Sequence, residues 1–453
     1  MPALPTSLAA VLHGPKDLRL EPRLLWAPEP GQCQVEVKAT GLCGSDLHYY
    51  IAGRNGDFAI RSPLVLGHES SGVITALGGG VATQYPHLRV GMRVAIECGI
   101  PCRSLNSDGS CRTGKDACKH CSNSRYNLCK NLRFCSSAKT FPHRDGMLQQ
   151  KINHEAWCLH PIPDTLSYSQ AALAEPLSVL LHASRRAGIC PPSSYPSLAS
   201  TSLSSSLSPS SSNMSLAAGK KILVFGVGAI GLIACALARE LGAERVCAVD
   251  INNDRLAFAA REGFTHGDGT GTYCLPLPSK SNSPEAYSSN PKEPENIRRA
   301  KENAANALSI FDEPDGFDII FECTGAEGCV LMSVFCATLG ARIALIGMGN
   351  PLVSSFPISA AATREVDLIG SFRYADTYNE AVELLSGSNL PKTTCKSSHL
   401  NGAQDSEKAG FSQKLAKLVT HRYPLSQAKE AFELLARGKD ERGGMVLKVV
   451  IEA

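Results

Sequence analysis

The chain has 453 residues, which allows two or three domains with buried cores and excludes a peptide or a minimal stapled module. Lysine and arginine total 45 against 42 aspartate and glutamate, and a net charge of only +3 argues against nucleic acid as the main partner. The first thirty residues lack the long apolar stretch of a secretory signal, and no apolar run reaches the ~20 residues that span a bilayer. We therefore expect a cytoplasmic protein without a membrane partner.

The opening 90 residues consist of short segments that alternate polar and apolar side chains, such as Gln34–Ala39, and that are broken by glycine and proline. A period of two is typical of strands with one buried face. We predict a β-rich, barrel-like N-terminal domain.

Two short segments of this region carry groups that bind metal. Cys43 opens the run Cys-Gly-Ser-Asp-Leu-His-Tyr, and His68 and Glu69 follow in Gly-His-Glu. A thiolate, an imidazole and a carboxylate together suit zinc, and three protein ligands that leave one position open are typical of a catalytic metal. Each residue alone has a plainer interpretation, since a single cysteine is most often a small core side chain.

Five cysteines crowd the next segment, at Cys102, Cys111, Cys118, Cys121 and Cys129. In a chain without a secretory signal, cysteines at this density favour thiols or metal ligands over disulfides. Four of them would form a closed four-thiolate zinc site, which is structural because no coordination position stays open. The Cys-x2-Cys pair alone could equally be a redox pair or part of a nucleic-acid-binding zinc ribbon, and the missing basic patch disfavours the ribbon.

Three polar segments look like insertions, near residues 191–217, 270–314 and 392–409. The first holds 13 serines between Pro191 and Ser215, and it has too few apolar side chains to offset the entropy of ordering it. We expect an exposed loop there. The charged segment Asn296–Leu308 is predicted to form an exposed helix.

From Lys220 the pattern changes to apolar strands that alternate with helices. A strand leads into Gly-Val-Gly-Ala-Ile-Gly, a helix of about a dozen residues follows, and the next strand ends at Asp250. Further units run to Phe317–Gly325 and Ala341–Gly349. This succession predicts an α/β fold with a Rossmann-type, doubly wound parallel sheet.

The glycine turn predicts a dinucleotide site. Gly226, Gly228 and Gly231 permit a tight turn and a close approach of the backbone to a pyrophosphate, which the helix N-terminus attracts. Asp250 is placed to accept both ribose hydroxyls and to repel a 2′-phosphate, which favours NAD over NADP, although Arg255 could stack on the adenine instead. A flavin also fits the glycines, and the metal-binding residues argue against it.

After Ser371 the pattern is mixed, with a helix near Tyr378–Leu385 and a final strand Val446–Glu452. Taken together, the chain resembles the zinc-dependent sorbitol (polyol) dehydrogenases of the medium-chain dehydrogenase/reductase superfamily, of the fungal sorbitol/xylitol type. The segments that carry the resemblance are GLCGSDLHYY, LGHESSGVI, RYNLC, LAEPLSVLLHASRRAG, VFGVGAIG, FECTGAEGC, GSFRYADTYNEA and KLVTHRYPLSQAKEAFE.

The resemblance implies a domain plan and an assembly. Residues 1–176 would form a GroES-like catalytic domain, residues 177–370 the NAD-binding Rossmann domain, and residues 371–453 a segment that completes the catalytic domain. The protein would be a homo-oligomer, a tetramer in the family.

The resemblance also implies roles for single residues. Cys43, His68 and Glu69 become the ligands of the catalytic zinc, with Glu175 beside the metal or its water. Ser45 and His48 would pass the substrate proton to solvent, and Asp46 would orient the ligand histidine. The expected polyol contacts are Tyr49, Glu175, Arg373 and Tyr374, and the expected cofactor contacts are Gly226, Gly228, Ile230, Gly231, Asp250, Arg255, Ile346, Gly347, Met348 and Phe372. A structural zinc would bind Cys102, Cys118, Cys121 and Cys129, with Cys111 as a substitute ligand.

The implied reaction is oxidation of a sugar alcohol to a ketose, with zinc lowering the pKa of the substrate hydroxyl and NAD accepting hydride. The chain departs from the family pattern where 15 residues separate Cys102 from Cys118. Xylitol, L-arabinitol or another secondary alcohol are alternative substrates. A catalytically silent protein that binds zinc and dinucleotide is the alternative from another class.

Overall fold

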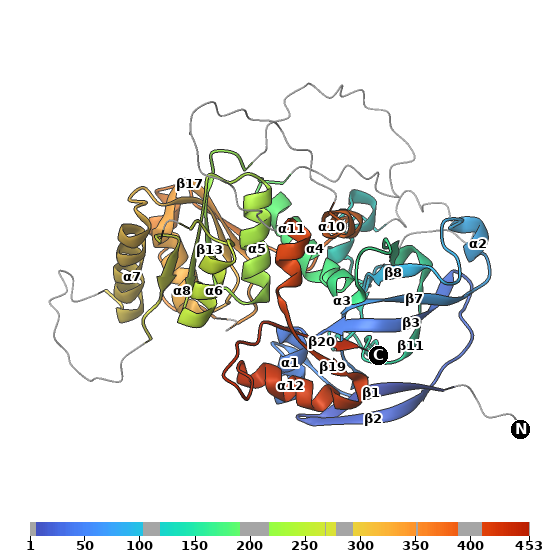
Figure 1. The fold of residues 1–453 in the computed structure, drawn as a ribbon. Coiled ribbons are helices and arrows are strands. Elements are labelled where there is room, and N and C mark those ends of the chain that lie inside the picture. Colours follow the sequence, from blue (N-terminus) through green and yellow to red (C-terminus); the bar gives the residue numbers. More distant parts are fainter. Residues whose placement is uncertain are drawn as a thin grey trace, which may run out of the picture.

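The computed structural model describes residues 6–102, 118–190, 217–267, 269–277, 293–349, 352–387 and 410–452. Two lobes lie side by side, one rich in β-strands and one built from a sheet between helices (Figure 1). Cys111, the serine-rich segment Pro191–Ser215 and the polar segment 392–409 fall outside the described residues. Within those ranges, every helix is too short or too polar to span a bilayer.

The β-rich lobe is built on a seven-stranded sheet that contains strands from the N-terminal and C-terminal parts of the chain. Its path is β12 (Leu159–Pro161), β8 (Arg93–Ile96), β7 (Glu69–Leu77), β3 (Gln32–Gly41), β20 (Lys448–Glu452) and β19 (Val419–Pro424), with β11 (Lys151–Glu155) paired to β3. The alternation in Gln34–Ala39 reflects its place in β3, where every second side chain is buried. Because β20 pairs with β3, the last strand belongs to the same sheet as a strand from the N-terminal part of the chain.

Smaller elements complete this lobe. They are a sheet of β2 (Asp17–Leu24), β1 (Thr6–Gly14) and β6 (Leu64–Val65), the pairs β4 (Arg54–Asn55) with β5 (Phe58–Ala59) and β9 (Gly99–Ile100) with β10 (Arg133–Phe134), the helices α1 (Gly44–Ala52), α2 (Val81–Gln84), α3 (Tyr168–Ala171) and α12 (Ala428–Arg437), and the 3₁₀ turns η2 (Cys121–Asn123), η3 (Tyr126–Leu128), η4 (Ala156–Cys158) and η5 (Leu425–Gln427).

The second lobe has a six-stranded sheet in which every pairing is parallel. The order is β15 (Thr272–Cys274), β14 (Arg245–Asp250), β13 (Lys221–Phe225), β16 (Phe317–Glu322), β17 (Ala337–Leu345) and β18 (Asp367–Gly370). The chain starts in the middle, runs to one edge and then crosses to the other half. This is the predicted doubly wound Rossmann arrangement.

Helices cover both faces of this sheet (Figure 1). Ile222 and Val224 of β13 pack in one hydrophobic core with α4 (Ala174–Arg186), α5 (Ala229–Glu240) and α6 (Asn253–Arg261). Leu223 and Phe225 point to the opposite face and pack in a second core with α7 (Glu295–Phe311) and α8 (Glu327–Cys336). The remaining helices are α9 (Ile358–Ala362), α10 (Tyr378–Leu385) and α11 (Phe411–Ala416).

The structure corrects the interpretation of residues 270–314 as an insertion. Thr272–Cys274 is β15, the edge strand that pairs with β14. The segment predicted to be an exposed helix is α7, which runs three residues further and buries Ile297, Ala300, Ala304, Ala307 and Phe311 against the sheet. Both elements are therefore integral to the α/β lobe.

Candidate functional site

Cys43, His68 and Glu69 meet between β3 and α1. Strand pairing sets Glu69 opposite Gly41 of β3, and Cys43 follows two residues later as the N-cap of α1. One ligand atom from each side chain lies within 4.8 Å of the others. A side chain at Gly41 would meet the Glu69 carboxylate at 2.4 Å, so only glycine leaves room for it. Sulfur, imidazole nitrogen and carboxylate oxygen form a donor set that fits zinc.

Buried Asp46 fixes the orientation of His68. Its Oδ1 lies 3.2 Å from His68 Nδ1 and accepts a hydrogen bond from Ser136 Oγ at 2.6 Å. Burial raises the pKa of Asp46, but the charge of His68 and the hydrogen bonds from His68, Ser136 and Gly67 bring it below its usual value. With Nδ1 engaged in this way, His68 presents Nε2 to a metal. Sequence analysis did not identify Ser136, which lacks a distinctive motif.

Glu69 is also held by a residue that sequence analysis missed. Lys448 of β20 donates from Nζ to both Glu69 oxygens at 2.7 Å and to the carbonyl of Leu42 at 3.2 Å. Both side chains are buried. Burial lowers the pKa of Lys448, and the Glu69 carboxylate more than reverses this and raises it. The signal available in the sequence was a lysine inside an apolar strand, which needs a buried partner.

Glu175 lies in the first turn of α4 and is almost fully buried. Its pKa is raised to about 7, mainly by burial; the charge of His68 opposes this rise, and the charge of Glu69 adds to it. Among the described residues, the group of three ligands at this centre does not include Glu175. It stands in the same electrostatic environment as the ligands, which fits a residue beside the metal.

Ser45, His48 and Tyr49 share α1 with the Cys43 cap. Ser45 is half-buried, while His48 is exposed and pairs through Nδ1 with Asn55 Oδ1 at 3.2 Å. Because residues three apart share a helix face, Ser45 and His48 lie on the same side of α1. Tyr49 is buried, and its hydroxyl accepts the N–H of Ala138 at 3.0 Å.

Arg373 and Tyr374 lie on the segment between β18 and α10. The Arg373 guanidinium stands 3.7 Å from the ring centroid of Phe134, and Nη2 donates to Ser137 Oγ at 3.3 Å. Burial lowers the pKa of Arg373 to about 10. Its Nη1 and the Tyr374 hydroxyl are buried without a hydrogen-bond partner among the described residues. Unpaired buried donors of this kind are suited to the hydroxyls of a ligand.

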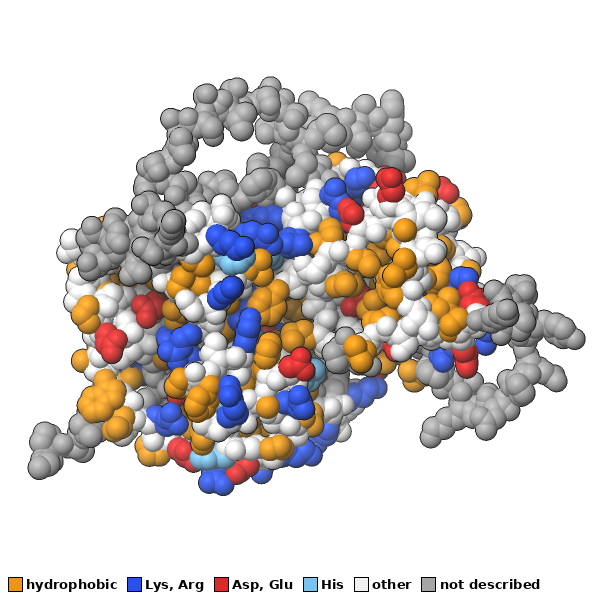
Figure 2. Space-filling view, turned by 180° about the vertical axis from the view of Figure 1, so that it is seen from behind, with side chains coloured by type: hydrophobic (Ala, Val, Ile, Leu, Met, Phe, Trp, Pro, Cys, Tyr) orange, Lys and Arg blue, Asp and Glu red, His pale blue; other side chains and the backbone are white. Residues whose placement is uncertain are grey.

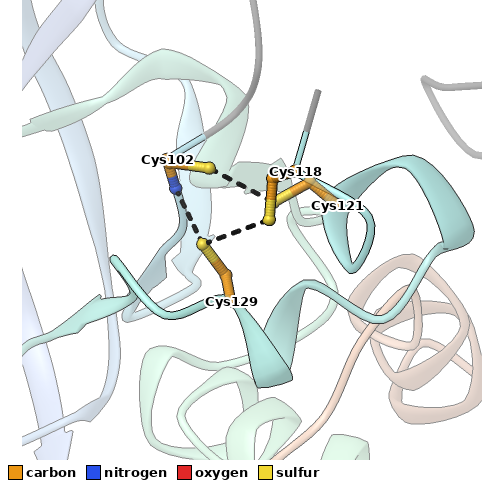
Figure 3. Close-up of side chains that lie close together, drawn as sticks. All are labelled: Cys102, Cys118, Cys121 and Cys129. Carbon is orange, nitrogen blue, oxygen red and sulfur yellow. Dashed lines mark hydrogen bonds between the residues drawn. The ribbon is translucent and has the colours of Figure 1, made fainter. Parts of the chain in front are cut away.

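Four cysteines form a second cluster in the β-rich lobe. The sulfurs of Cys102, Cys118, Cys121 and Cys129 converge (Figure 3), all within 4.8 Å of one another. Burial raises the pKa of Cys118, but the N–H groups of Cys121 and His120 donate to its sulfur and bring the pKa down to about 7. Four thiolates close a tetrahedral shell, so the donor set fits a structural zinc.

The predicted dinucleotide turn is formed by the three glycines between β13 and α5. Gly226 has φ +85°, and a side chain at Gly231 would meet the Gly226 carbonyl at 1.7 Å. Gly228 caps α5, whose N-terminus opens the site, and Ile230 lies in its first turn. Asp250 ends β14 and accepts the N–H of Val227 at 2.7 Å and of Asn252 at 2.8 Å.

The other predicted cofactor contacts surround the same end of the sheet. Gly347 follows β17, and a side chain there would meet the N–H of Gly325 after β16 at 2.2 Å. Ile346 flanks it, Met348 is exposed, and Phe372 follows β18. Arg255, in α6, has a buried Nε without a hydrogen-bond partner among the described residues. Carboxyl ends of parallel strands are where doubly wound sheets bind dinucleotides.

Comparisons with known proteins find relatives along nearly the whole chain. Residues 29–164 match the family described as alcohol dehydrogenase GroES-like domain, and residues 291–387 match the zinc-binding dehydrogenase family. A sorbitol dehydrogenase of Gallus gallus is 33% identical over 439 residues, covering 97% of this chain and 96% of that protein. The sorbitol dehydrogenase of Bos taurus is 32% identical over 450 residues, covering 99% and 97%.

Solved structures share the fold. L-idonate 5-dehydrogenase from Escherichia coli superposes with a TM-score of 0.68 at 24% identity, and 2R,3R-butanediol dehydrogenase from Bacillus subtilis with 0.65 at 22%. Each comparison covers 99% of both chains. The two-lobed arrangement is therefore common to this chain and to those dehydrogenases.

Proposed function

The chain belongs to the zinc-dependent sorbitol dehydrogenase family, and from that premise we propose that it oxidises a sugar alcohol to a ketose and transfers the hydride to NAD. The observation that carries the proposal is the convergence of Cys43, His68 and Glu69, with Asp46 fixing the histidine. Such a centre leaves a coordination position for substrate.

Catalysis is assigned to the residues around this centre. When bound, zinc supplies a Lewis acid that lowers the pKa of the substrate hydroxyl. Cys43, His68 and Glu69 would hold the ion, and Ser45 and His48 would carry the released proton along α1 to solvent.

The remaining hydroxyls of the substrate need partners of their own. Arg373 Nη1 and the Tyr374 hydroxyl are the unpaired buried donors that would orient them. Glu175, whose pKa is about 7, can hold or release a proton near neutral pH. Together these groups would place the reacting carbon against the nicotinamide.

The test is oxidation of sorbitol, xylitol and L-arabinitol with NAD and with NADP, followed by absorbance of the reduced cofactor. We expect turnover with NAD that His68→Gln abolishes, while His87→Gln, on an exposed histidine, retains it. Normal turnover in a His68→Gln protein shown to lack the metal at this centre would overturn the proposal.

The proposal includes a homotetramer. Among the described residues, β18 pairs only with β17 and so forms one edge of the sheet. Large apolar side chains around that edge are exposed, namely Leu339, Leu352, Ile358 and Leu368. Figure 2, seen from behind, shows apolar side chains gathered on the α/β lobe at the right of the view. A sheet edge flanked by apolar surface favours pairing with a second copy.

The proposal also includes a cytoplasmic location. The chain has 18 cysteines, and none of the sixteen that fall in the described ranges takes part in a disulfide. A reducing compartment is where so many cysteines, nine of them buried outside the two clusters, remain without disulfides.

A further inference from the structure

The segment that carries Arg373 and Tyr374 has an unusual backbone. Arg373 and Asp376 both have positive φ, +52° and +53°, which side-chain-bearing residues rarely adopt. Such conformations persist where surrounding contacts determine them. The contacts that hold this segment, residues 371–376, are therefore of functional interest.

Two neighbouring residues of the cysteine loop, residues 118–129, hold the segment near each end. Asn127 Nδ2 donates to the carbonyl of Phe372 at 2.8 Å. The N–H of Asp376 donates to the Tyr126 hydroxyl at 3.0 Å. The two hydrogen bonds bracket Arg373 and Tyr374.

Tyr126 and Asn127 are themselves fixed. The Tyr126 hydroxyl donates to Glu97 Oε1 at 2.5 Å, and the other oxygen of this buried carboxylate pairs with His160 Nε2 at 2.9 Å. Asn127 is only 4% exposed, and its Nδ2 lies 3.4 Å from His182 Nε2. Burial lowers the pKa of His182 to about 4, so the neutral ring can accept this contact.

The position of these two residues in the chain links them to the second cluster. Tyr126 and Asn127 form the 3₁₀ turn η3, which Cys121 precedes and Cys129 follows directly. A metal on the four cysteines would therefore anchor this turn at both ends.

We propose that Tyr126 and Asn127 are positioning residues for the polyol, because they clamp the segment that presents Arg373 and Tyr374 to it. This inference rests on the proposed function, in which Arg373 touches the substrate. It would also link the four-cysteine cluster to substrate binding, since Cys121 and Cys129 flank the clamp in the chain.

The experiment is a double-mutant cycle with Asn127→Ala and Arg373→Ala in the full-length enzyme. For Asn127→Ala we expect the KM for sorbitol to rise about tenfold, because one hydrogen bond is lost. The kcat should change less than twofold. The double variant should be no worse than Arg373→Ala alone, because both changes act through the same side chain. The Kd for NADH and the zinc content should stay within twofold of the parent.

The matched control is Asn123→Ala in the same loop, where Nδ2 donates to the nearby carbonyl of Lys119 at 2.6 Å. It should leave the KM unchanged. If Asn127→Ala does not fold, Tyr126→Phe removes one hydroxyl and should raise the KM in the same way.

The outcomes separate the two proposals. A parent enzyme that oxidises no polyol would refute the proposed function. A parent that does so, with a KM raised by Arg373→Ala but not by Asn127→Ala or Tyr126→Phe, would refute the clamp alone. Fully additive effects of the two substitutions on KM would also refute it. So would a rise in the Kd for NADH as large as the rise in KM.

Discussion

At the scale of single residues, the Asp250 carboxylate combines a structural and a selective role. It caps the N–H groups of Val227 and Asn252, and it stands where the adenosine ribose is expected. Its charge would oppose a 2′-phosphate, so its substitution should change which cofactor is accepted.

Asp250→Ser is expected to raise the ratio of kcat/KM for NADP to that for NAD by roughly 10- to 100-fold. One charge-assisted contact, about 1.5–3 kcal/mol, accounts for a change of this size. Kinetics with both cofactors measure it. Asp250→Asn is the control, because it removes the charge and keeps an oxygen for the Val227 N–H. A parent enzyme that already prefers NADP would contradict the assignment.

His182 predicts a pH dependence of stability. Burial, followed by repulsion from Arg186, Arg185 and Arg125, lowers its pKa to about 4 from an ordinary 6.5. Between pH 6.5 and 4 the unfolded chain binds a proton that the folded chain does not. The contribution of His182 to the free energy of unfolding is therefore fully present above pH 6.5. It falls by up to about 3 kcal/mol as the pH drops to 4.

His182→Gln should remove that component, so the free energy of unfolding should depend less steeply on pH between 6.5 and 4. Urea denaturation at a series of pH values measures this. An unchanged slope would mean that the ring titrates normally.

At the scale of elements, the sequence predicted helices and strands with a clear local pattern better than it predicted pairings between distant segments. The helix predicted near Tyr378–Leu385 is confirmed with the same bounds. The buried face of α7 was missed because Ala300, Ala304 and Ala307 are small and stand among charged residues. Short β15 was missed because three residues carry too little periodicity.

The candidate site shows the same difference between local motifs and contacts between distant residues. The sequence predicted the metal ligands because Cys43, His68 and Glu69 each stand in a short, recognisable motif. It could not indicate that Lys448 pairs with Glu69, 379 positions away, or that Asn127 binds Phe372, 245 positions away. Such contacts depend on how the strands and loops are brought together in the fold.

The cysteine loop yields a prediction about metal content. The parent should hold about two zinc ions per chain, and Cys102→Ser should hold one and melt at a lower temperature, because its sulfur belongs to the four-cysteine cluster. The longer connection to Cys118 costs little, about 0.6 kcal/mol per doubling of loop length. Cys111→Ser is the control and should keep both ions. The reverse pattern would make Cys111 the ligand.

At the scale of the whole molecule, the two edges of the Rossmann sheet differ in what they are expected to do. The edge at β18 is the proposed contact with a second copy, and β15 forms the opposite edge. Both carry exposed leucines nearby, Leu368 at β18 and Leu277 after β15.

Leu368→Lys should therefore shift the protein to a smaller assembly, because it places a charge in the proposed contact. Leu277→Lys is its matched control and should leave the assembly as it is. Sedimentation velocity distinguishes the two. A parent that sediments as a monomer, or equal effects of both changes, would contradict the proposed contact.

The pairing of β20 with β3 has a consequence for biosynthesis. Glu69 is made early, but the Lys448 ammonium that neutralises it lies 379 positions later. At 5–20 residues per second, the ribosome needs roughly 20 to 80 s to supply that partner. Throughout this interval the nascent chain carries the three zinc-binding side chains without the strand that completes their sheet, so the catalytic centre can mature only after translation of the C-terminal strand.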